Sequence, residues 1–248
     1  IGSPAPRLVP TRDGRTWVSR AADRYCLFEF IDGVNYSSAY LLRAHRLGLT
    51  ALLGGVLAHI HRDLAGFCPT GRHHLGFAAY DGPRRRDLAW HAARIAELSA
   101  ASADLPAAAD RRHAAWLVDR GDAILEDLSR LDAALNDAAL PRLIIHGDYG
   151  LHNLVVRALD RATPVDFELA RLEWRLSDLA SCLSKMRYAA GGYDFDGMRH
   201  FMRAYRAVYP IDPDEWRWIP DVLRHRRLME AVQNRNSYFE TGGPTGTL

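Results

Sequence analysis

Three polar residues near the middle of the chain have the types and the spacing that phosphoryl transfer requires. Asp148 follows a short apolar run, Asn153 stands five positions later, and Asp166 follows a second apolar run and a polar turn. Phosphoryl transfer depends mainly on positioning and charge neutralisation, so it needs a carboxylate beside the attacking hydroxyl and oxygen ligands for Mg²⁺. Mg²⁺ takes few protein ligands and completes its shell with water and phosphate oxygens. The pattern therefore predicts Asp148 as the catalytic base and Asn153 and Asp166 as magnesium ligands.

Short strands must bring these three residues together. The apolar runs 143–145 and 154–156 predict two strands, and the charged segment 157–162 predicts the turn that leads towards Asp166. A lone His-Gly-Asp triplet is more often a turn than a site. Here the joint spacing of three polar residues between apolar strands makes coincidence the weaker explanation. His152, inside the loop, is expected to be a solvent-facing spacer rather than a substrate contact.

This segment resembles the catalytic signature of the aminoglycoside phosphotransferase and choline kinase superfamily, whose members share the protein-kinase fold. The resemblance rests on His146-Gly147-Asp148, on Asn153 and on Val165-Asp166-Phe167-Glu168. It implies an α+β, protein-kinase-like fold, with a truncated small β lobe and a mainly helical large lobe that carries the catalytic hairpins. Gly147 lets the backbone turn sharply. His146 is expected to be structural and bonded to backbone near the loop.

Weaker likenesses to the same family extend over most of the chain. Residues 52–61 resemble the helix that starts the larger lobe, and residues 175–180 resemble a segment in which Asp178 opens a helix and braces the catalytic loop. An aspartate is favoured at such a helix start. Residues 25–33 resemble the last small-lobe strand and the hinge beside adenine, although an ordinary edge strand would look the same. The resemblance implies that the hinge residues bind the nucleotide: Phe28, Glu29, Phe30 and Ile31.

Part of the small lobe is missing from the pattern. The family's glycine-rich loop over the phosphates and the lysine that contacts them are not found, and the only lysine, Lys185, follows the catalytic segment. We therefore expect residues 1–33 to be a remnant of the small β lobe with its hinge, and residues 34–248 to form the helical catalytic lobe. The chain opens on Ile1 rather than methionine. We expect a segment of a longer protein rather than a degenerate relative, because Asp148, Asn153 and Asp166 all remain.

The composition is that of an ordinary globular protein. Of the 248 residues, 48% are hydrophobic and 25% are charged, and the formal net charge of +2 gives no argument for nucleic-acid binding. Cys26, Cys68 and Cys182 form neither a metal spacing nor a disulfide framework, so a reducing cytoplasm is expected. No apolar run approaches a membrane span and no signal peptide is visible. We expect neither a nucleic-acid nor a membrane partner, and the oligomeric state stays open.

Most of the remaining chain is predicted to be helical, after an N-terminal hairpin. Asp13-Gly14 between apolar flanks predicts a hairpin turn, with strands at 16–19 and 25–31. Apolar residues recur at helical spacing, or alanine is frequent, in the other segments. Helices are expected at 37–64, 87–101, 107–138, 178–188, 198–208 and 215–238, the last with a possible interruption at Pro220.

The favoured function is ATP- and Mg²⁺-dependent phosphorylation of a hydroxyl group on a small molecule. The acceptor could be an aminoglycoside, a choline-like amino alcohol, homoserine or a sugar. An acidic pocket would suit a polycationic aminoglycoside, and an aromatic cage would suit choline. The candidate acceptor-binding residues are Glu168, Asp194, Asp196, Glu230 and Tyr238. The alternative is a non-catalytic nucleotide-binding or scaffold relative, which the missing glycine-rich loop and lysine favour.

Overall fold

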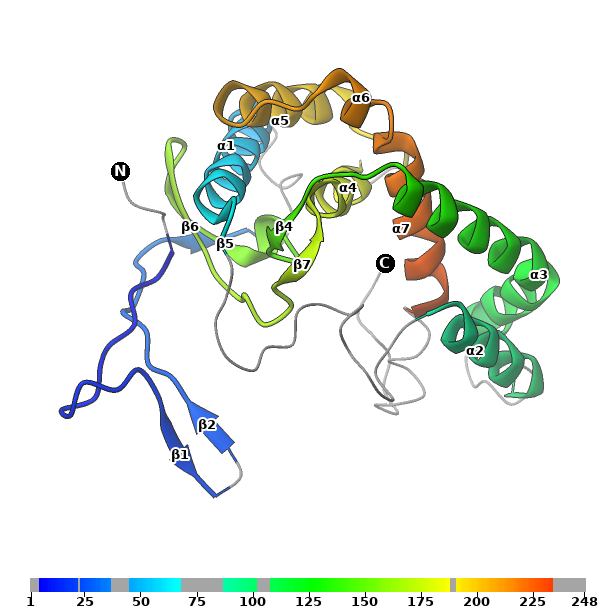
Figure 1. Ribbon diagram of the computed structural model, residues 1–248, viewed down its shortest axis with the longest axis horizontal. Helices are drawn as coiled ribbons and strands as arrows, with labels where there is room; N and C mark the ends of the chain where they lie inside the picture. The colour runs from blue at the N-terminus through cyan, green and yellow to red at the C-terminus, as the bar shows by residue number, and fades with distance from the viewer. Residues whose placement is uncertain are drawn as a thin grey trace. The chain divides into compact units, whose positions relative to one another are not determined.

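A computed structural model of the chain describes residues 5–21, 23–36, 45–67, 87–101, 108–187 and 191–233. The helices are α1 (Arg46–Leu64), α2 (Leu88–Ala101), α3 (Ala108–Asp137), α4 (Arg175–Lys185), α5 (Phe195–Val208), α6 (Pro213–Trp216) and α7 (Ile219–Gln233) (Figure 1). The strands are β1 (Val18–Arg20), β2 (Asp23–Tyr25), β3 (Val34–Asn35), β4 (Arg142–Ile145), β5 (Leu154–Ala158), β6 (Arg161–Pro164) and β7 (Arg171–Trp174). A 3₁₀ turn, Leu151–Asn153, precedes β5.

The chain divides into two compact units. The first comprises Ile1–Phe67, Ile144–Ala170 and Lys185–Ile211, and the second comprises Cys68–Leu143, Arg171–Ser184 and Asp212–Leu248. The first unit thus joins the N-terminal strands to the segment that carries Asp148, Asn153 and Asp166. The predicted division into residues 1–33 and 34–248 does not coincide with these units and stays a prediction.

An antiparallel sheet in the first unit carries the predicted catalytic segment. Its central strand, β5, pairs with β6 on one edge and with β3 on the other. Leu154 lies opposite Pro164, and Val156 lies opposite Val34. Leu154, Val156 and Ala162 are buried, because alternate residues of a strand point to the same face. This apolar face positions the strand ends between which the polar residues lie.

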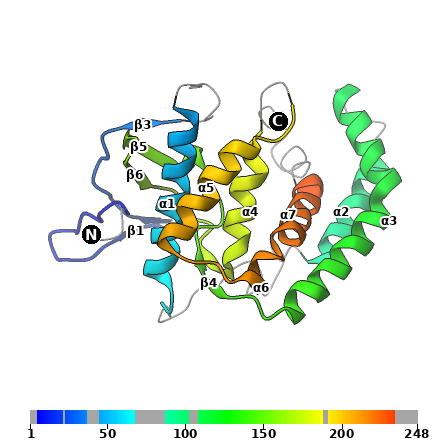
Figure 2. The same ribbon diagram turned by 90° about the horizontal axis from the view of Figure 1, so that it is seen from above.

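Helices α1 and α5 lie side by side in both views and provide the core of the first unit (Figures 1 and 2). Leu57, Phe201 and Tyr205 are fully buried. His61 Nδ1 lies 2.8 Å from the Tyr205 hydroxyl, so the two helices also share a buried hydrogen bond. The helices approach closely at Gly54, where a β carbon would collide with the backbone carbonyl of Phe201.

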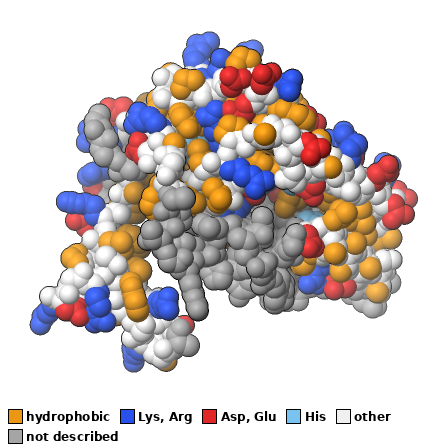
Figure 3. Space-filling view, viewed as in Figure 1, with side chains coloured by type: hydrophobic (Ala, Val, Ile, Leu, Met, Phe, Trp, Pro, Cys, Tyr) orange, Lys and Arg blue, Asp and Glu red, His pale blue; other side chains and the backbone are white. Residues whose placement is uncertain are grey.

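The N-terminal segment turns where the sequence predicts. The Gly14 N–H donates to the Thr11 carbonyl at 2.9 Å, and Gly14 has a φ of 79°. The predicted strands are shorter and shifted, because β1 and β2 pair through a tight turn that places Val18 opposite Tyr25. Phe28 instead bridges to Leu8. Apolar side chains gather on the surface of this segment (Figure 3).

The second unit is built around the long helix α3, which packs against α2 and α7. The alanine-rich helices predicted at 87–101 and 107–138 are confirmed as α2 and α3. The predicted interruption at Pro220 is also found, because this proline lies in the first turn of α7, where its missing N–H leaves no hydrogen bond unmade. The buried side chains of this core include Leu98, Leu117, Ile124, Leu128 and Val232. None of the helices in the described ranges has the length and apolarity needed to cross a membrane.

The close approach at Gly54 predicts a large difference between two neighbouring substitutions. Gly54→Ala should lower the free energy of unfolding by about 1–3 kcal/mol, because the added methyl group forces α1 away from α5. Gly55→Ala is the matched control, since a β carbon at Gly55 meets nothing within 4 Å. That control should be neutral or up to about 1 kcal/mol more stable, from helix propensity. Equal free energies in urea denaturation would contradict the tight packing.

Candidate active site

The loop that carries Asp148 is held in place by two buried neighbours. His146 donates from Nε2 to the Val165 carbonyl at 2.9 Å, because a carbonyl can only accept. The Tyr149 hydroxyl donates to the Leu53 carbonyl of α1 at 2.9 Å. Both side chains are fully buried, and Gly147 between them has a left-handed φ of 90°. The loop is therefore fixed to β6 on one side and to α1 on the other, and His146 makes the structural contact expected of it.

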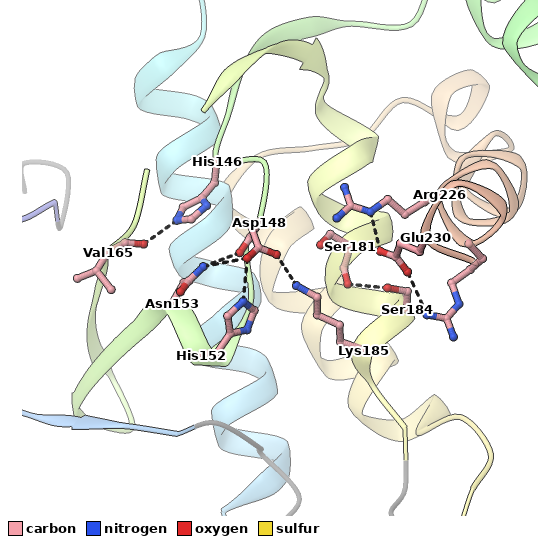
Figure 4. Close-up of polar contacts among 11 residues, drawn as sticks. His146, Asp148, His152, Asn153, Val165, Ser181, Ser184, Lys185, Arg226 and Glu230 are labelled. Carbon is pink, nitrogen blue, oxygen red and sulfur yellow. Dashed lines mark hydrogen bonds and ion pairs between the residues drawn. The ribbon is translucent and has the colours of Figure 1, made fainter. Parts of the chain in front are cut away.

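Three side chains converge on Asp148, as Figure 4 shows. Lys185 donates from Nζ to Oδ1 at 2.7 Å, and His152 donates from Nε2 to Oδ2 at 3.2 Å. Asn153 donates from Nδ2 to the Asp148 backbone carbonyl at 2.9 Å and lies 3.4 Å from Oδ2. The Asp148 side chain is still 36% exposed, so an acceptor hydroxyl has room to reach it.

These contacts decide the protonation state of Asp148. Burial by itself would raise the pKa of Asp148. The hydrogen bonds and charges from His152 and Lys185 outweigh burial and hold that pKa well below its ordinary value. The carboxylate is therefore ionised at neutral pH and can accept a hydrogen bond from a hydroxyl group. A protonated carboxyl could not serve as the base in the same way.

Backbone pairing places the residue before Asp166 beside the catalytic loop. The Val165 N–H donates to the Asn153 carbonyl at 2.9 Å, while the Val165 carbonyl accepts from His146. Asp166 then adopts a left-handed φ of 67°, which is uncommon outside glycine. Its exposed carboxylate makes no hydrogen bond or ion pair with the part of the chain that the structure describes. Asp166 therefore follows the end of β6, close in the backbone to Asn153, and its carboxylate is unpaired among the described residues.

Asn153 and Asp166 fit a magnesium site better than a site for a metal that needs many protein ligands. The Asn153 side chain is buried and donates from its amide nitrogen to Asp148, whereas a cation would take its amide oxygen. No group of three or more His, Cys, Asp or Glu side chains in the described ranges could hold a metal ion. A pair of side-chain oxygens is the kind of ligand set that Mg²⁺ completes with water and phosphate oxygens, and the magnesium assignment stays a prediction.

The predicted hinge residues lie on an exposed strand edge. The Glu29 N–H donates to the Arg7 carbonyl at 2.9 Å, so this donor is already used. Phe28 is half exposed and Phe30 is 94% exposed. In an extended chain, the backbone groups of the residues on either side of Glu29 point to the opposite edge. Contact with adenine in this segment would therefore fall to Phe28 or Phe30, with Ile31 following them.

The candidate acceptor-binding carboxylates are mostly engaged by nearby arginines. Asp194 is fully buried, accepts from the Gly197 N–H at 3.0 Å as the cap of α5, and pairs with Arg46. Asp196 pairs with Arg199. Glu230, in the second unit, pairs with two arginines of α7, Arg226 at 2.8 Å and Arg227 at 3.1 Å. Glu168 is exposed, and Tyr238 lies outside the described residues. The fold itself thus accounts for the contacts of Asp194.

Asp178 belongs to the second compact unit. It stands in the first turn of α4, in the second unit, and its side chain is fully buried. Burial of a carboxylate is costly unless it is hydrogen-bonded. This burial agrees with a structural role, and the brace to the catalytic loop stays a prediction.

Three residues that contact the site were not predicted from the sequence. His152 reaches Asp148 instead of being a solvent-facing spacer, and Lys185 returns to the loop from the end of α4. Asn35 donates from Nδ2 to the carbonyls of His152 at 2.5 Å and Leu154 at 3.2 Å. That Lys185 is the chain's only lysine was one available signal. Nothing local in the sequence indicated its contact with a residue 37 positions away.

Comparisons with known proteins agree with this geometry. The model of the phosphotransferase enzyme family matches residues 1–219. No curated protein matches the chain.

Three solved structures illustrate the likeness. An amicoumacin kinase in complex with AMP-PNP, Ca²⁺ and Ami is 16% identical, with a TM-score of 0.61 over 98% of this chain and 67% of that one. An aminoglycoside-3′-phosphotransferase of type VIII is 22% identical, with a TM-score of 0.57 over 93% and 74%. A choline/ethanolamine kinase family protein from Mesorhizobium loti is 15% identical, with a TM-score of 0.54 over 98% and 68%.

These comparisons confirm both the family resemblance and the α+β, kinase-like fold that the motif predicts. The chain spans about two thirds of the length of most of the kinases it resembles. The predicted truncation of the small lobe concerns where the chain begins, and it stays a prediction.

The left-handed backbone at Asp166 predicts a difference between two substitutions that both remove its charge. Asp166→Asn should keep the wild-type free energy of unfolding, because asparagine adopts positive φ almost as readily as aspartate. Asp166→Ala should be less stable by about 1 kcal/mol, from the steric cost of this conformation for an ordinary side chain. Urea denaturation of both variants measures the difference. Equal stability of the two would contradict the backbone conformation at Asp166.

Proposed function

We propose that this chain, which belongs to the phosphotransferase enzyme family, is the catalytic part of an enzyme that transfers a phosphoryl group from ATP to a hydroxyl group of a small molecule. The observation that carries the proposal is the arrangement around Asp148. Its ionised carboxylate, the Asn153 amide and the chain leading to Asp166 are joined in one hydrogen-bonded loop. A scaffold protein would have no need to keep all three.

Asp148 would act as the base towards the acceptor. Its carboxylate accepts a hydrogen bond from the acceptor hydroxyl and orients the oxygen lone pair. The acceptor oxygen then forms a bond to the γ-phosphorus, the bond from that phosphorus to the β,γ-bridging oxygen breaks, and ADP leaves. The hydroxyl proton passes to Asp148 and on to solvent. Positioning and charge neutralisation, rather than covalent catalysis, are what such a step requires from the protein.

Asn153 and Asp166 would hold Mg²⁺ through their side-chain oxygens. When bound, the ion supplies positive charge that offsets the charge of the nucleotide phosphates. Asn153 is already oriented, because its amide nitrogen is bonded to the Asp148 carbonyl. The unpaired Asp166 carboxylate has no competing cation among the described residues. Use of ATP is supported by the AMP-PNP bound to the amicoumacin kinase.

The acceptor class stays among the small hydroxyl compounds named from the motif: aminoglycosides, choline-like amino alcohols, homoserine and sugars. The related structures include an amicoumacin kinase, an aminoglycoside-3′-phosphotransferase and a choline/ethanolamine kinase family protein. A polycationic aminoglycoside would need unpaired carboxylates. Asp194, Asp196 and Glu230 are each paired with arginine, so these three candidates give this acceptor no special support.

Removal of the Asp148 carboxylate should abolish useful turnover. Asp148→Asn is expected to lower kcat by roughly 10²- to 10⁴-fold, the usual effect of losing a general base. Asp160→Asn is the matched control, because Asp160 is an exposed carboxylate in the β5–β6 turn. ATP consumption should be measured with the complete protein against a panel of hydroxyl acceptors. Near-wild-type turnover of Asp148→Asn would refute its role, and an inactive wild type with every acceptor class would favour the scaffold alternative.

The magnesium assignment makes a separate prediction. Asp166→Asn and Asn153→Ala should each raise the Mg²⁺ concentration that gives half-maximal ATP consumption by at least about tenfold, in line with the loss of one ligand contact. Glu168→Gln removes a charge two residues from Asp166 and tests whether this neighbour also approaches the ion. A Mg²⁺ requirement unchanged in Asp166→Asn would contradict the assignment.

A further inference from the structure

Lys185 stands beside the reacting position without having been assigned any part in the reaction. It is the last residue of α4, and its ammonium group donates to Asp148 Oδ1 at 2.7 Å. His152 reaches the other carboxylate oxygen, Oδ2. The Lys185 side chain is 37% exposed, so solvent and ligands can reach the ammonium group. Figure 4 shows Lys185 and His152 both directed at Asp148.

The loop leaves space for this convergence at Gly150. A β carbon at Gly150 would lie 2.6 Å from His152 Cε1 and 3.7 Å from Lys185 Cδ. A side chain at this position would therefore collide with the His152 ring and pack against the lysine stem. The absence of a side chain keeps the surface beside Asp148 open where both donors approach it.

Stability alone is a weak reason for this ion pair. Partly exposed salt bridges contribute about 0–1 kcal/mol, because solvent screens them and ordering the side chains costs entropy. An ammonium group on a flexible stem is instead well suited to bind a phosphate group as a point charge. An ammonium group carries three N–H donors, so it can bond a carboxylate and a phosphate oxygen at the same time.

The reaction itself brings a second anion to the same place. An acceptor hydroxyl bonded to Asp148 attacks the γ-phosphorus, so the oxygens of the transferred phosphoryl group must come within a few ångströms of the Asp148 carboxylate. Two negative groups at this separation repel each other unless a cation lies between them. The Lys185 ammonium group, at 2.7 Å from Asp148, is a cation placed to offset this repulsion.

We propose that Lys185 is a catalytic residue, whose ammonium group contacts the transferred phosphoryl group while holding Asp148 towards the acceptor. This inference rests on the proposed phosphotransferase function. In the step, the acceptor oxygen gains the bond to phosphorus, the bridging oxygen of ADP takes the electron pair of the broken bond, and the hydroxyl proton passes to Asp148. Lys185 keeps its own protons and donates hydrogen bonds to the phosphoryl oxygens as their charge rearranges.

Kinetics of three variants test the role. Lys185→Met should lower kcat by about 10²- to 10³-fold, the usual cost of one preorganised donor, with the KM for the acceptor changed only a few-fold. Lys185→Arg keeps the charge and should recover part of the loss. Arg187→Met is the matched control, because it removes an exposed cation two residues away that packs over Tyr193. Wild-type kcat in Lys185→Met would overturn the proposal.

Chemical labelling gives a readout that does not depend on turnover. Because Lys185 is the chain's only lysine, its acylation by N-hydroxysuccinimidyl acetate can be followed on one peptide by mass spectrometry. Mg²⁺ with AMP-PNP should slow this labelling several-fold, in the wild type and in Asp148→Asn alike. A labelling rate unchanged by Mg²⁺ and AMP-PNP would overturn the phosphoryl contact.

The outcomes separate this inference from the function on which it rests. A wild-type protein that phosphorylates no acceptor overturns the proposed function and, with it, the role of Lys185. An active wild type whose Lys185→Met variant matches Arg187→Met overturns the role of Lys185 alone. An active wild type with a selective kcat loss in Lys185→Met and protected labelling supports both.

Discussion

The two backbone bonds of Val165 are the constraint on which the site depends. Its carbonyl accepts from the buried His146, and its N–H donates to the Asn153 carbonyl. These bonds fix the end of β6 against both ends of the catalytic loop. Asp166 comes immediately afterwards, so its position relative to Asp148 and Asn153 follows from the backbone rather than from side-chain contacts. A site defined this way keeps its shape when solvent-exposed side chains change rotamer, which preorganised catalysis requires.

Electrostatics divides the two aspartates of the site between different tasks. Asp148 is surrounded by donors from Lys185 and His152, which keep its pKa low and its carboxylate oriented. Asp166 has no such partner among the described residues and keeps its charge available for a cation. If Lys185 lay beside Asp166 instead, it would compete with Mg²⁺ for the carboxylate. The position of Lys185 thus distinguishes the carboxylate proposed as the base from the carboxylate proposed as the metal ligand.

Sequence reasoning succeeded where the determining contacts are local. The strands around Asp148 and the helices α2 and α3 follow from apolar patterning and composition over short windows. It failed for Lys185 and Asn35, which reach the loop from 37 and 117 residues away, because no local pattern encodes such contacts. The same limit applies to Asp194. Its acidic side chain made it a candidate contact for the acceptor. In the structure, its carboxylate pairs with the distant Arg46 and caps the start of α5.

The two ends of the proposed nucleotide site are built on different physical terms. At the proposed phosphate end, Asn153 is 6% exposed and its amide is bonded to the Asp148 carbonyl. The Asn153 side chain is therefore already ordered before a nucleotide binds. At the proposed adenine end, Phe28 and Phe30 are exposed residues, and hydrogen bonds from this segment to a base would compete with those of water. Under the proposed function, the residues assigned to phosphoryl transfer are therefore better ordered before binding than the residues assigned to the base of the nucleotide.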